Sequence, residues 1–532
     1  MRTSILSVSK FLSLIIGTIA IVPIIIIFTS FLDIDTNIWI HLKNYVLPEL
    51  IVNTVLLILG VSLGTLCIGV PLAYLNSFFD FPARKFFTFL AILPLAIPAY
   101  IMAFVYIALF DSTGTWSIFI KDFLNLSFFL PSIRNFWGVS FVLSLCFYPY
   151  VYLLAKNAFE NQGIRAIEVG QTMGLSSFSI LRKITIPLAR SWIFSGLLLA
   201  LMETLADFGA VSIFNYSTFT TAIYRSWFGL YSLKSAEQLA SLLIIAVLFF
   251  VILERQLDKK KSYTTIGRGG AKPQRVKLKF FGTFLALSFS FLVSFFSFLI
   301  PATMITKWAI EVFNKDFDER YLGFILNSIQ ISILTVAVLL IAGLIMAYAV
   351  RKYPGIIGAI IKNLSSLGYA VPGSVLAVGV FIFLNTIETQ IGTGQKILTG
   401  GLVGLITGLS IRFYSLCLAP LSTSFLRITD SHFSVMSLSK NKKYKNFLNI
   451  ILPLIKPGII SAALIIFVEV LKEMPITLMT RPFGKETLAI RVFEMTSEGE
   501  WQRAALPSLF LILVSLIPTI LIHLQSENNH DK

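Results

Sequence analysis

Two stretches of the chain place acidic residues inside long apolar runs. The first carries Glu203 and Asp207, and the second carries Glu469, Lys472 and Glu473. In each stretch the two carboxylates are four residues apart, which places them on one face of an α-helix. Ionisable groups inside a membrane are costly and usually mark a pathway or a buried partner. The pattern predicts a polar translocation pathway. The alternative is structural, with Lys472 paired to a neighbouring carboxylate and the others bridging gaps between helices.

Motifs for catalysis or for tight metal binding do not occur in the sequence. There is no GxxxxGK[ST] loop that would cradle ATP phosphates and no HExxH motif, and the four histidines are scattered. Cys67, Cys146 and Cys417 lie far apart inside apolar runs, without a disulfide framework or a CxxC signature. We therefore expect that the chain is not an enzyme, binds no cofactor and holds no permanent metal.

A polar, basic segment precedes the first acidic stretch and carries a recognisable order of residues. It reads Glu168-Val169-Gly170, followed by Gly174 and then by Pro187. Residues 159–173 contain no proline and mix polar with apolar side chains, which predicts a short amphipathic helix. Gly174 suits the left-handed turn that ends such a helix, and small residues near Gly170 would let a partner surface approach closely.

The composition indicates a membrane protein. The 532 residues are 56% hydrophobic and only 13% charged, and the mean hydropathy is +0.83. Apolar runs long enough to cross a bilayer predict an all-α fold of twelve transmembrane helices. These runs lie near 11–32, 49–76, 86–110, 136–155, 191–214, 236–253, 280–303, 323–350, 358–384, 398–420, 457–479 and 505–523.

The distribution of charge predicts the orientation of these spans. The formal net charge is +16, and the basic residues gather in short segments between apolar runs, which argues against nucleic-acid binding. Segments on the side of the termini hold roughly twice as many Lys and Arg as those on the other side, so both termini are expected to be cytoplasmic. Tyr148, Tyr150 and Tyr152, near the inner end of the fourth span, are expected to form an interfacial aromatic belt rather than to serve as metal ligands.

The chain contains a parallel internal repeat. Residues of the two halves correspond at an offset of 274 early in each half (Pro98 and Pro372) and at 266 later (Pro187 and Pro453). Each half has an even number of spans, so both insert the same way up. The predicted division is a first helix and outer loop (1–48), a first-half domain (49–254), a basic cytoplasmic linker (255–279), a seventh helix and outer loop (280–322), a second-half domain (323–524) and a cytoplasmic tail (525–532).

With these features in place, the chain resembles the fused, two-half permeases of ATP-binding-cassette (ABC) importers of the ferric-iron class. The loop from Glu168 to Pro187 resembles the "EAA" coupling loop of that family, and residues 202–209 and 219–225 are the most specific stretches. The resemblance implies the type I ABC importer fold, ATPase subunits (two copies) docked on the coupling loop and alternating access driven by ATP. It also implies an extracytoplasmic protein that binds Fe³⁺, and a location in the bacterial inner membrane.

The second half departs from this pattern. Its coupling loop carries Ser434 and Lys440 where the family has Glu and Gly, although Pro453 is present. The second loop is therefore expected to contribute less to ATPase coupling than the first. Thiamine, sulfate or polyamine importers remain alternatives within the family. A secondary transporter with two six-span halves is the alternative outside the family. Such a protein would need neither the basic loop before the fifth span nor its second copy before the eleventh.

Overall fold

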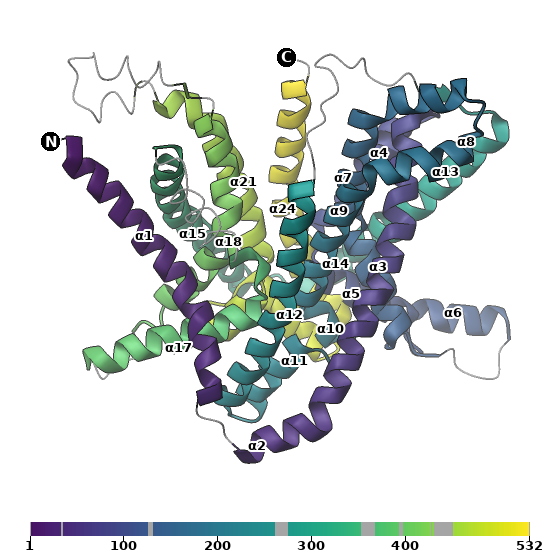
Figure 1. Cartoon of the computed structure of the whole chain (residues 1–532). Helices are drawn as coiled ribbons and strands as arrows, with labels where there is room; N and C mark the ends of the chain where they lie inside the picture. Colours follow the sequence, from purple (N-terminus) through teal and green to yellow (C-terminus); the bar gives the residue numbers. More distant parts are fainter. Residues whose placement is uncertain are drawn as a thin grey trace.

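The structure is a computed structural model, and it describes residues 2–32, 36–125, 131–260, 275–352, 368–392, 397–426, 428–429, 449 and 451–530. Over these residues the fold is helical apart from one short parallel strand pair, β1 (Phe79–Asp80) with β2 (Val276–Lys277). This pair holds the end of the linker against the first half of the chain. The N- and C-termini lie toward the same end of the molecule (Figure 1).

The helices of the first half follow one another with short connections. In chain order they are α1 (Arg2–Ile26), η1 (Ile27–Leu32), α2 (Thr36–His41), η2 (Leu42–Val46), α3 (Leu47–Phe78), α4 (Arg84–Leu90), η3 (Leu93–Ala96), α5 (Ala99–Phe110), α6 (Thr115–Phe123), α7 (Phe136–Thr172), α8 (Ser177–Ile180), η4 (Leu181–Thr185), α9 (Ile186–Ala206), α10 (Gly209–Ile213), α11 (Phe219–Tyr224), η5 (Arg225–Gly229) and α12 (Leu233–Lys260).

The second half repeats this succession over its described residues. Its helices are α13 (Phe280–Ser294), η6 (Phe295–Leu299), α14 (Ile300–Asp316), α15 (Glu319–Lys352), α17 (Gly373–Ile391), α18 (Leu402–Leu426), α21 (Leu452–Lys472), α22 (Pro475–Thr480), α23 (Leu488–Ser497) and α24 (Trp501–His530).

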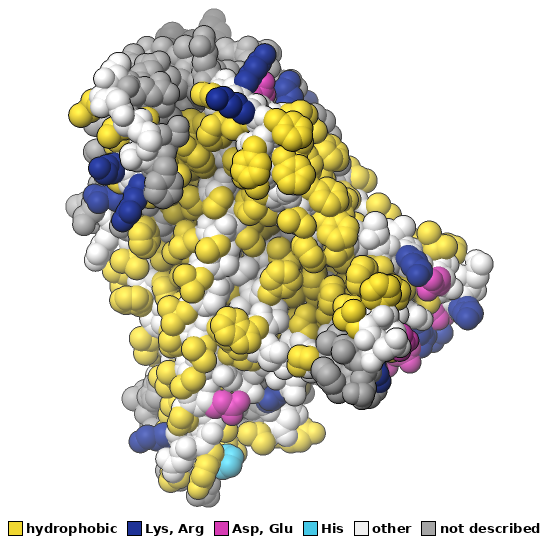
Figure 2. All heavy atoms as spheres, turned by 90° about the vertical axis from the view of Figure 1, so that its right-hand side faces the viewer, with side chains coloured by type: hydrophobic (Ala, Val, Ile, Leu, Met, Phe, Trp, Pro, Cys, Tyr) yellow, Lys and Arg dark blue, Asp and Glu magenta, His cyan; other side chains and the backbone are white. Residues whose placement is uncertain are grey.

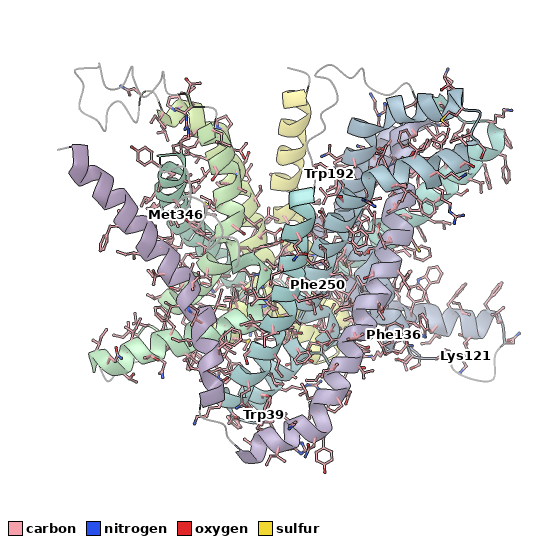
Figure 3. All side chains as sticks on the ribbon, viewed as in Figure 1. Trp39, Lys121, Phe136, Trp192, Phe250 and Met346 are labelled. Atoms are coloured by element: carbon pink, nitrogen blue, oxygen red, sulfur yellow. The ribbon has the colours of Figure 1, made fainter. Side chains whose placement is uncertain are left out.

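The predicted all-α membrane fold is confirmed. Among the described residues, ten helical segments are long and apolar enough to cross a membrane. Two shorter apolar segments, Ile15–Ser30 and Trp501–Ile517, fall on the first and last of the twelve predicted spans. Hydrophobic side chains cover a broad band across the middle of one face, and charged side chains lie both above and below it (Figure 2). Trp39 lies at the end of the molecule opposite the termini (Figure 3).

Three predicted spans have a different shape from the one expected. The span at 86–110 is divided into α4, η3 and α5, because Pro94 and Pro98 cannot donate the hydrogen bonds that would continue a helix. The spans at 191–214 and 457–479 are also interrupted, since α9 ends at Ala206 and α21 at Lys472. Each of these last two breaks falls beside an acidic residue that the sequence singled out.

The two halves have the same packing. In the first half α7 packs against both α3 and α9, and in the second half α18 packs against both α15 and α21. Pro98 and Pro372 precede α5 and α17 with nearly identical backbone angles, φ −57° and ψ 145° for Pro98 and φ −56° and ψ 145° for Pro372. The parallel repeat found in the sequence is therefore a structural repeat.

The halves are joined by an exchange of their first helices. Helix α1 packs against α15 and α17 of the second half. In return, α13 packs against α3 and α4, and α14 packs against α5 as well as α24. Each half therefore completes the packing of the other, and neither forms a separate bundle.

Close approach between neighbouring helices depends on glycine at matching positions. A Cβ on Gly69 of α3 would lie 3.0 Å from the Tyr148 carbonyl oxygen of α7. A Cβ on Gly343 of α15, 274 residues later, would lie 2.6 Å from the Cys417 sulfur of α18. Small residues of this kind let membrane helices pack backbone to backbone.

We predict that Gly69→Leu destabilises the first half by about 1–3 kcal/mol, because α7 must move to admit the side chain. The measurement is the Tm of the purified chain in detergent, together with its abundance in the membrane. Gly323→Leu, in α15, is the matched control, since a Cβ added at Gly323 would have no atom within 4 Å. It should leave both quantities unchanged. Equal losses in the two variants would contradict the packing argument.

Candidate functional site

The second acidic residue of each pair lies at a break in a membrane helix. Helix α9 ends at Ala206, and Asp207 is extended with φ −65° and ψ 129°. Helix α21 ends at Lys472, and Glu473 has almost the same angles, φ −68° and ψ 122°. The prediction that both carboxylates of a pair share one helical face is therefore wrong, because the helix stops between them.

The carboxylates at the breaks bind the backbone of the helix that follows. Asp207 Oδ1 accepts a hydrogen bond of 3.0 Å from Val211 N in α10. The two oxygens of Glu473 accept from Ile476 N at 2.8 Å and from Thr477 N at 3.0 Å, and Thr477 Oγ1 donates to Glu473 at 3.0 Å. Acidic side chains favour this position, because they satisfy N–H groups that begin a helix and lack intrahelical partners.

The first acidic residue of each pair contacts the opposite half or a neighbouring cation. Glu203 Oε1 accepts a hydrogen bond of 2.6 Å from the Tyr369 hydroxyl of the second half. Glu469 Oε1 lies 3.4 Å from Lys472 Nζ, which also donates to the Leu95 carbonyl of the first half at 3.0 Å. The structural alternative placed Lys472 beside Glu469 or Glu473, and the pairing with Glu469 is present.

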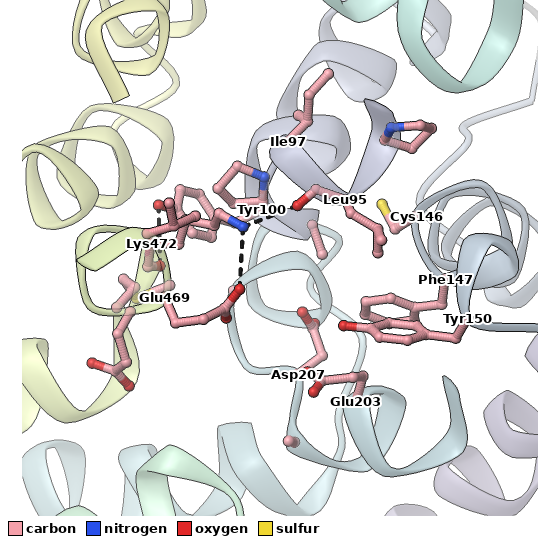
Figure 4. A pocket seen from close by; sticks show the side chains of 18 of the residues that line it. Leu95, Ile97, Tyr100, Cys146, Phe147, Tyr150, Glu203, Asp207, Glu469 and Lys472 are labelled. Atoms are coloured by element: carbon pink, nitrogen blue, oxygen red, sulfur yellow. Dashed lines mark hydrogen bonds and ion pairs between the residues drawn. The ribbon is translucent and has the colours of Figure 1, made fainter. Parts of the chain in front are cut away.

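These side chains line one cavity of ≈ 520 Å³ between the halves. All five residues predicted for the pathway contribute to its wall, and Figure 4 shows Glu469 and Lys472 on one side with Glu203 and Asp207 on the other. The wall also contains Arg412, Tyr100, Tyr150, Tyr369 and Cys146. By formal charge the wall holds four carboxylates and two cations.

Arg412 is a functional candidate that the sequence reasoning missed. It lies in α18, and its Nε and Nη1 atoms are buried without a hydrogen-bond acceptor. A charge in the middle of the apolar run 398–420 was the available signal, since such residues are rare in membrane helices. At the 266 offset its counterpart in the first half is Cys146, so this charge has no equivalent there.

The expected aromatic belt is also wrong. Tyr148 and Tyr152 are fully buried, and they contact Ser297 Oγ and Asn76 Nδ2 at 3.4 Å and 3.0 Å. Tyr150 lies between them in sequence and faces the cavity instead. The reason is helical geometry: residues four apart share a face, and here that face packs against other helices instead of lipid headgroups.

The loop between the fourth and fifth spans is partly as predicted. Residues 159–172 form the end of the long helix α7, and Gly174 has a left-handed φ of +71°. Leu175 N donates to the Gly170 carbonyl at 3.0 Å, the bond that closes a helix ending in a left-handed glycine.

Residues of this chain approach Gly170 closely. A Cβ there would lie 2.9 Å from Ile180 and 3.0 Å from Ile184, which pack over it. Pro187 and Pro453 both lie in the first turn of their helices, α9 and α21. The side chains of Glu168 and Val169, and the residues Ser434 and Lys440, lie outside what the structure describes.

Among the described residues, no group of three or more His, Cys, Asp and Glu side chains is arranged to hold a metal ion. The acidic side chains of the cavity instead accept hydrogen bonds from backbone N–H groups, a lysine and a tyrosine hydroxyl. The cavity is therefore a polar chamber whose acidic groups are mostly paired.

Comparison with known proteins agrees with this architecture. Residues 65–263 match the family described as "Binding-protein-dependent transport system inner membrane component". The chain is 29% identical to the Fe(3+)-transport system permease protein FbpB 2 of Haemophilus influenzae over 483 residues, 90% of each chain. It is 22% identical to the putative ferric transport system permease protein FbpB 1 of the same organism over 410 residues, 71% of this chain and 62% of the relative.

A relative with a different named cargo matches a shorter part of the chain. The sulfate transport system permease protein CysW of Escherichia coli is 26% identical over 199 residues, 37% of this chain and 66% of that protein.

We predict that Glu473→Ala destabilises the chain by about 1–3 kcal/mol, because it leaves the N–H groups of Ile476 and Thr477 buried without an acceptor. Thermal unfolding in detergent measures the loss. Glu473→Gln keeps one acceptor oxygen and should lose less. A Tm for Glu473→Ala equal to that of the unmodified chain would show that the carboxylate does not hold the break together.

Proposed function

We propose that this chain is a fused permease of the binding-protein-dependent ABC importer class and that it carries Fe³⁺ across the membrane. The observation that carries the proposal is the cavity between the halves, into which each half contributes two carboxylates. Fe³⁺ is a hard cation that prefers oxygen ligands, and a negative chamber attracts it. The names of the relatives that match most of the chain support the same cargo.

The partners follow from the class of transporter. Fe³⁺ would be delivered by an extracytoplasmic binding protein, and ATP would be hydrolysed by separate ATPase subunits on the cytoplasmic side. Alternating access would expose the cavity first to one side and then to the other. The location is the bacterial cytoplasmic membrane with both termini inside, and the chain itself is not expected to catalyse a reaction or to bind a cofactor.

Coupling to the ATPase is proposed for the loop that ends α7. Glu168 would contact the ATPase, while the turn at Gly174 and the packing of Ile180 over Gly170 would fix the angle of the loop. A rigid loop of this kind passes movement of a docked subunit to α7 and α9, which both line the cavity. The second loop, with Ser434 and Lys440, would contribute less.

A small oxyanion such as sulfate is the second candidate cargo. Arg412 and Lys472 line the cavity and would attract an anion. Four carboxylates in the same chamber repel an anion, and for this reason Fe³⁺ is the first choice. Uptake of radioactive sulfate measured beside uptake of radioactive iron separates the two, since a sulfate transporter would take up sulfate and not iron.

For the pathway, we predict that Glu203→Gln together with Glu469→Gln slows iron uptake at least tenfold, because the field that attracts the cation is weakened. Uptake of radioactive iron into cells and the abundance of the permease in the membrane are measured side by side. Abundance and ATPase docking should remain normal. A fall in abundance that matches the fall in uptake would assign these residues a structural role, and normal uptake would remove the pathway role.

For coupling, we predict that Gly174→Trp together with Glu168→Ala abolishes uptake while the protein remains in the membrane. The physical reason is that a bulky residue strains the left-handed turn and disturbs the docking surface. Gly174→Asn is the matched control, since asparagine tolerates this conformation. The changes Ser434→Glu and Lys440→Gly should be tolerated. Unimpaired uptake by the double variant would overturn the assignment of the loop.

A further inference from the structure

Three side-chain oxygens meet on one side of the cavity. The Tyr369 hydroxyl donates to Glu203 Oε1 at 2.6 Å, and the hydroxyl of Tyr150 interacts with that of Tyr369. Tyr150 comes from α7 and Glu203 from α9 of the first half, whereas Tyr369 precedes α17 in the second half. Figure 4 shows Tyr150 beside Glu203 and Asp207. The cluster therefore lies where the two halves meet.

We propose that Tyr150, Tyr369 and Glu203 form a transient Fe³⁺ site in the cavity, an inference that rests on the proposed function. Phenolate and carboxylate oxygens are hard ligands of the kind that a trivalent cation prefers. When Fe³⁺ binds, each phenol O–H bond breaks and an Fe–O bond forms, and the two protons pass to water in the cavity. The iron keeps its oxidation state. Two phenolates and one carboxylate balance the three positive charges, which lowers the cost of holding the ion inside the membrane.

The surroundings of the three residues distinguish them from structural tyrosines. Tyr148 and Tyr152, two residues to either side of Tyr150, are fully buried among helices. Tyr150, Tyr369 and Glu203 are each partly exposed, and all three line the cavity. The short hydrogen bond from Tyr369 keeps two of the ligands together before the ion arrives, which reduces the ordering that binding requires.

Arg412 keeps this site weak. It lines the same cavity from α18 and lies close enough to Glu203 to interact electrostatically. Its positive charge repels an incoming cation. Its Nε and Nη1 groups donate no hydrogen bond to a carboxylate. Transport fails when an ion is bound too tightly to leave. A cation beside the ligands therefore suits a site that must release its cargo in every cycle.

The test is spectroscopic and uses the permease purified with its ATPase subunits. Fe³⁺ is added as its nitrilotriacetate chelate, and the visible absorption is recorded, since phenolate bound to ferric iron gives a charge-transfer band that carboxylate ligands do not give. We expect the band in the unmodified complex and its loss in Tyr150→Phe and in Tyr369→Phe. Tyr148→Phe, on the same helix but away from the cavity, is the matched control and should keep the band.

A second variant tests the role of Arg412. Arg412→Gln should bind Fe³⁺ several-fold more tightly in the same titration and should slow uptake of radioactive iron. Resonance Raman spectra of the unmodified complex identify tyrosinate vibrations directly, so the inference is tested even where a tyrosine variant fails to fold. Unchanged binding in Arg412→Gln would remove its weakening role.

The outcomes separate this site from the proposed function. Uptake of iron by the unmodified complex without a band or tyrosinate vibrations overturns the site and leaves the function standing. A band that persists in both tyrosine variants also overturns it, because the iron is then bound elsewhere. Absence of iron uptake, with the binding protein and ATP supplied, overturns the proposed function itself.

Discussion

A helix that stops inside a membrane exposes backbone groups that lipid cannot hydrogen-bond, and this structure depends on how two such breaks are satisfied. At each break an acidic side chain binds the N–H groups of the next short helix, Asp207 for α10 and Glu473 for α22. In this way a carboxylate that would be costly in the bilayer acquires fixed partners. The breaks also end α9 and α21 at the cavity, where Glu203 and Glu469 lie on the last turn of each helix.

The exchange of first helices explains why the cavity belongs to both halves. Helix α1 packs on the second half, whereas α13 and α14 pack partly on the first. Under the proposed alternating access, movement of one half relative to the other would carry a helix of its neighbour with it. The contacts across the cavity, from Tyr369 to Glu203 and from Lys472 to the Leu95 carbonyl, join the same two units and would change when they move.

The repeat is symmetric in its backbone and asymmetric in its charges. Lys472 and Arg412 have Ala206 and Cys146 as their counterparts in the first half. A fused chain permits such differences, because the two halves are encoded separately and each position can vary on its own. Both cations in the cavity thus come from the second half, and they moderate a chamber that four carboxylates would otherwise make strongly attractive to cations.

The sequence by itself determined the membrane class, the helical spans, the parallel repeat and the acidic residues that line the cavity. Hydropathy, helical period and the spacing of charges are local properties, and a run such as 323–350 spans the membrane whatever it packs against. The left-handed turn at Gly174 was also predictable, because its cause lies within one helix end. The pathway and coupling roles of these residues remain predictions.

Only the tertiary structure decided which side of each helix faces the cavity. It buried Tyr148 and Tyr152 while leaving Tyr150 in the wall, and it brought Tyr369 to Glu203 from far along the chain. It also turned Asp207 and Glu473 from members of a helical face into caps at a break. These outcomes depend on contacts between residues that lie 76 to 166 positions apart, or on competition between a side chain and the backbone for the same N–H groups. Neither leaves a periodic trace in the sequence.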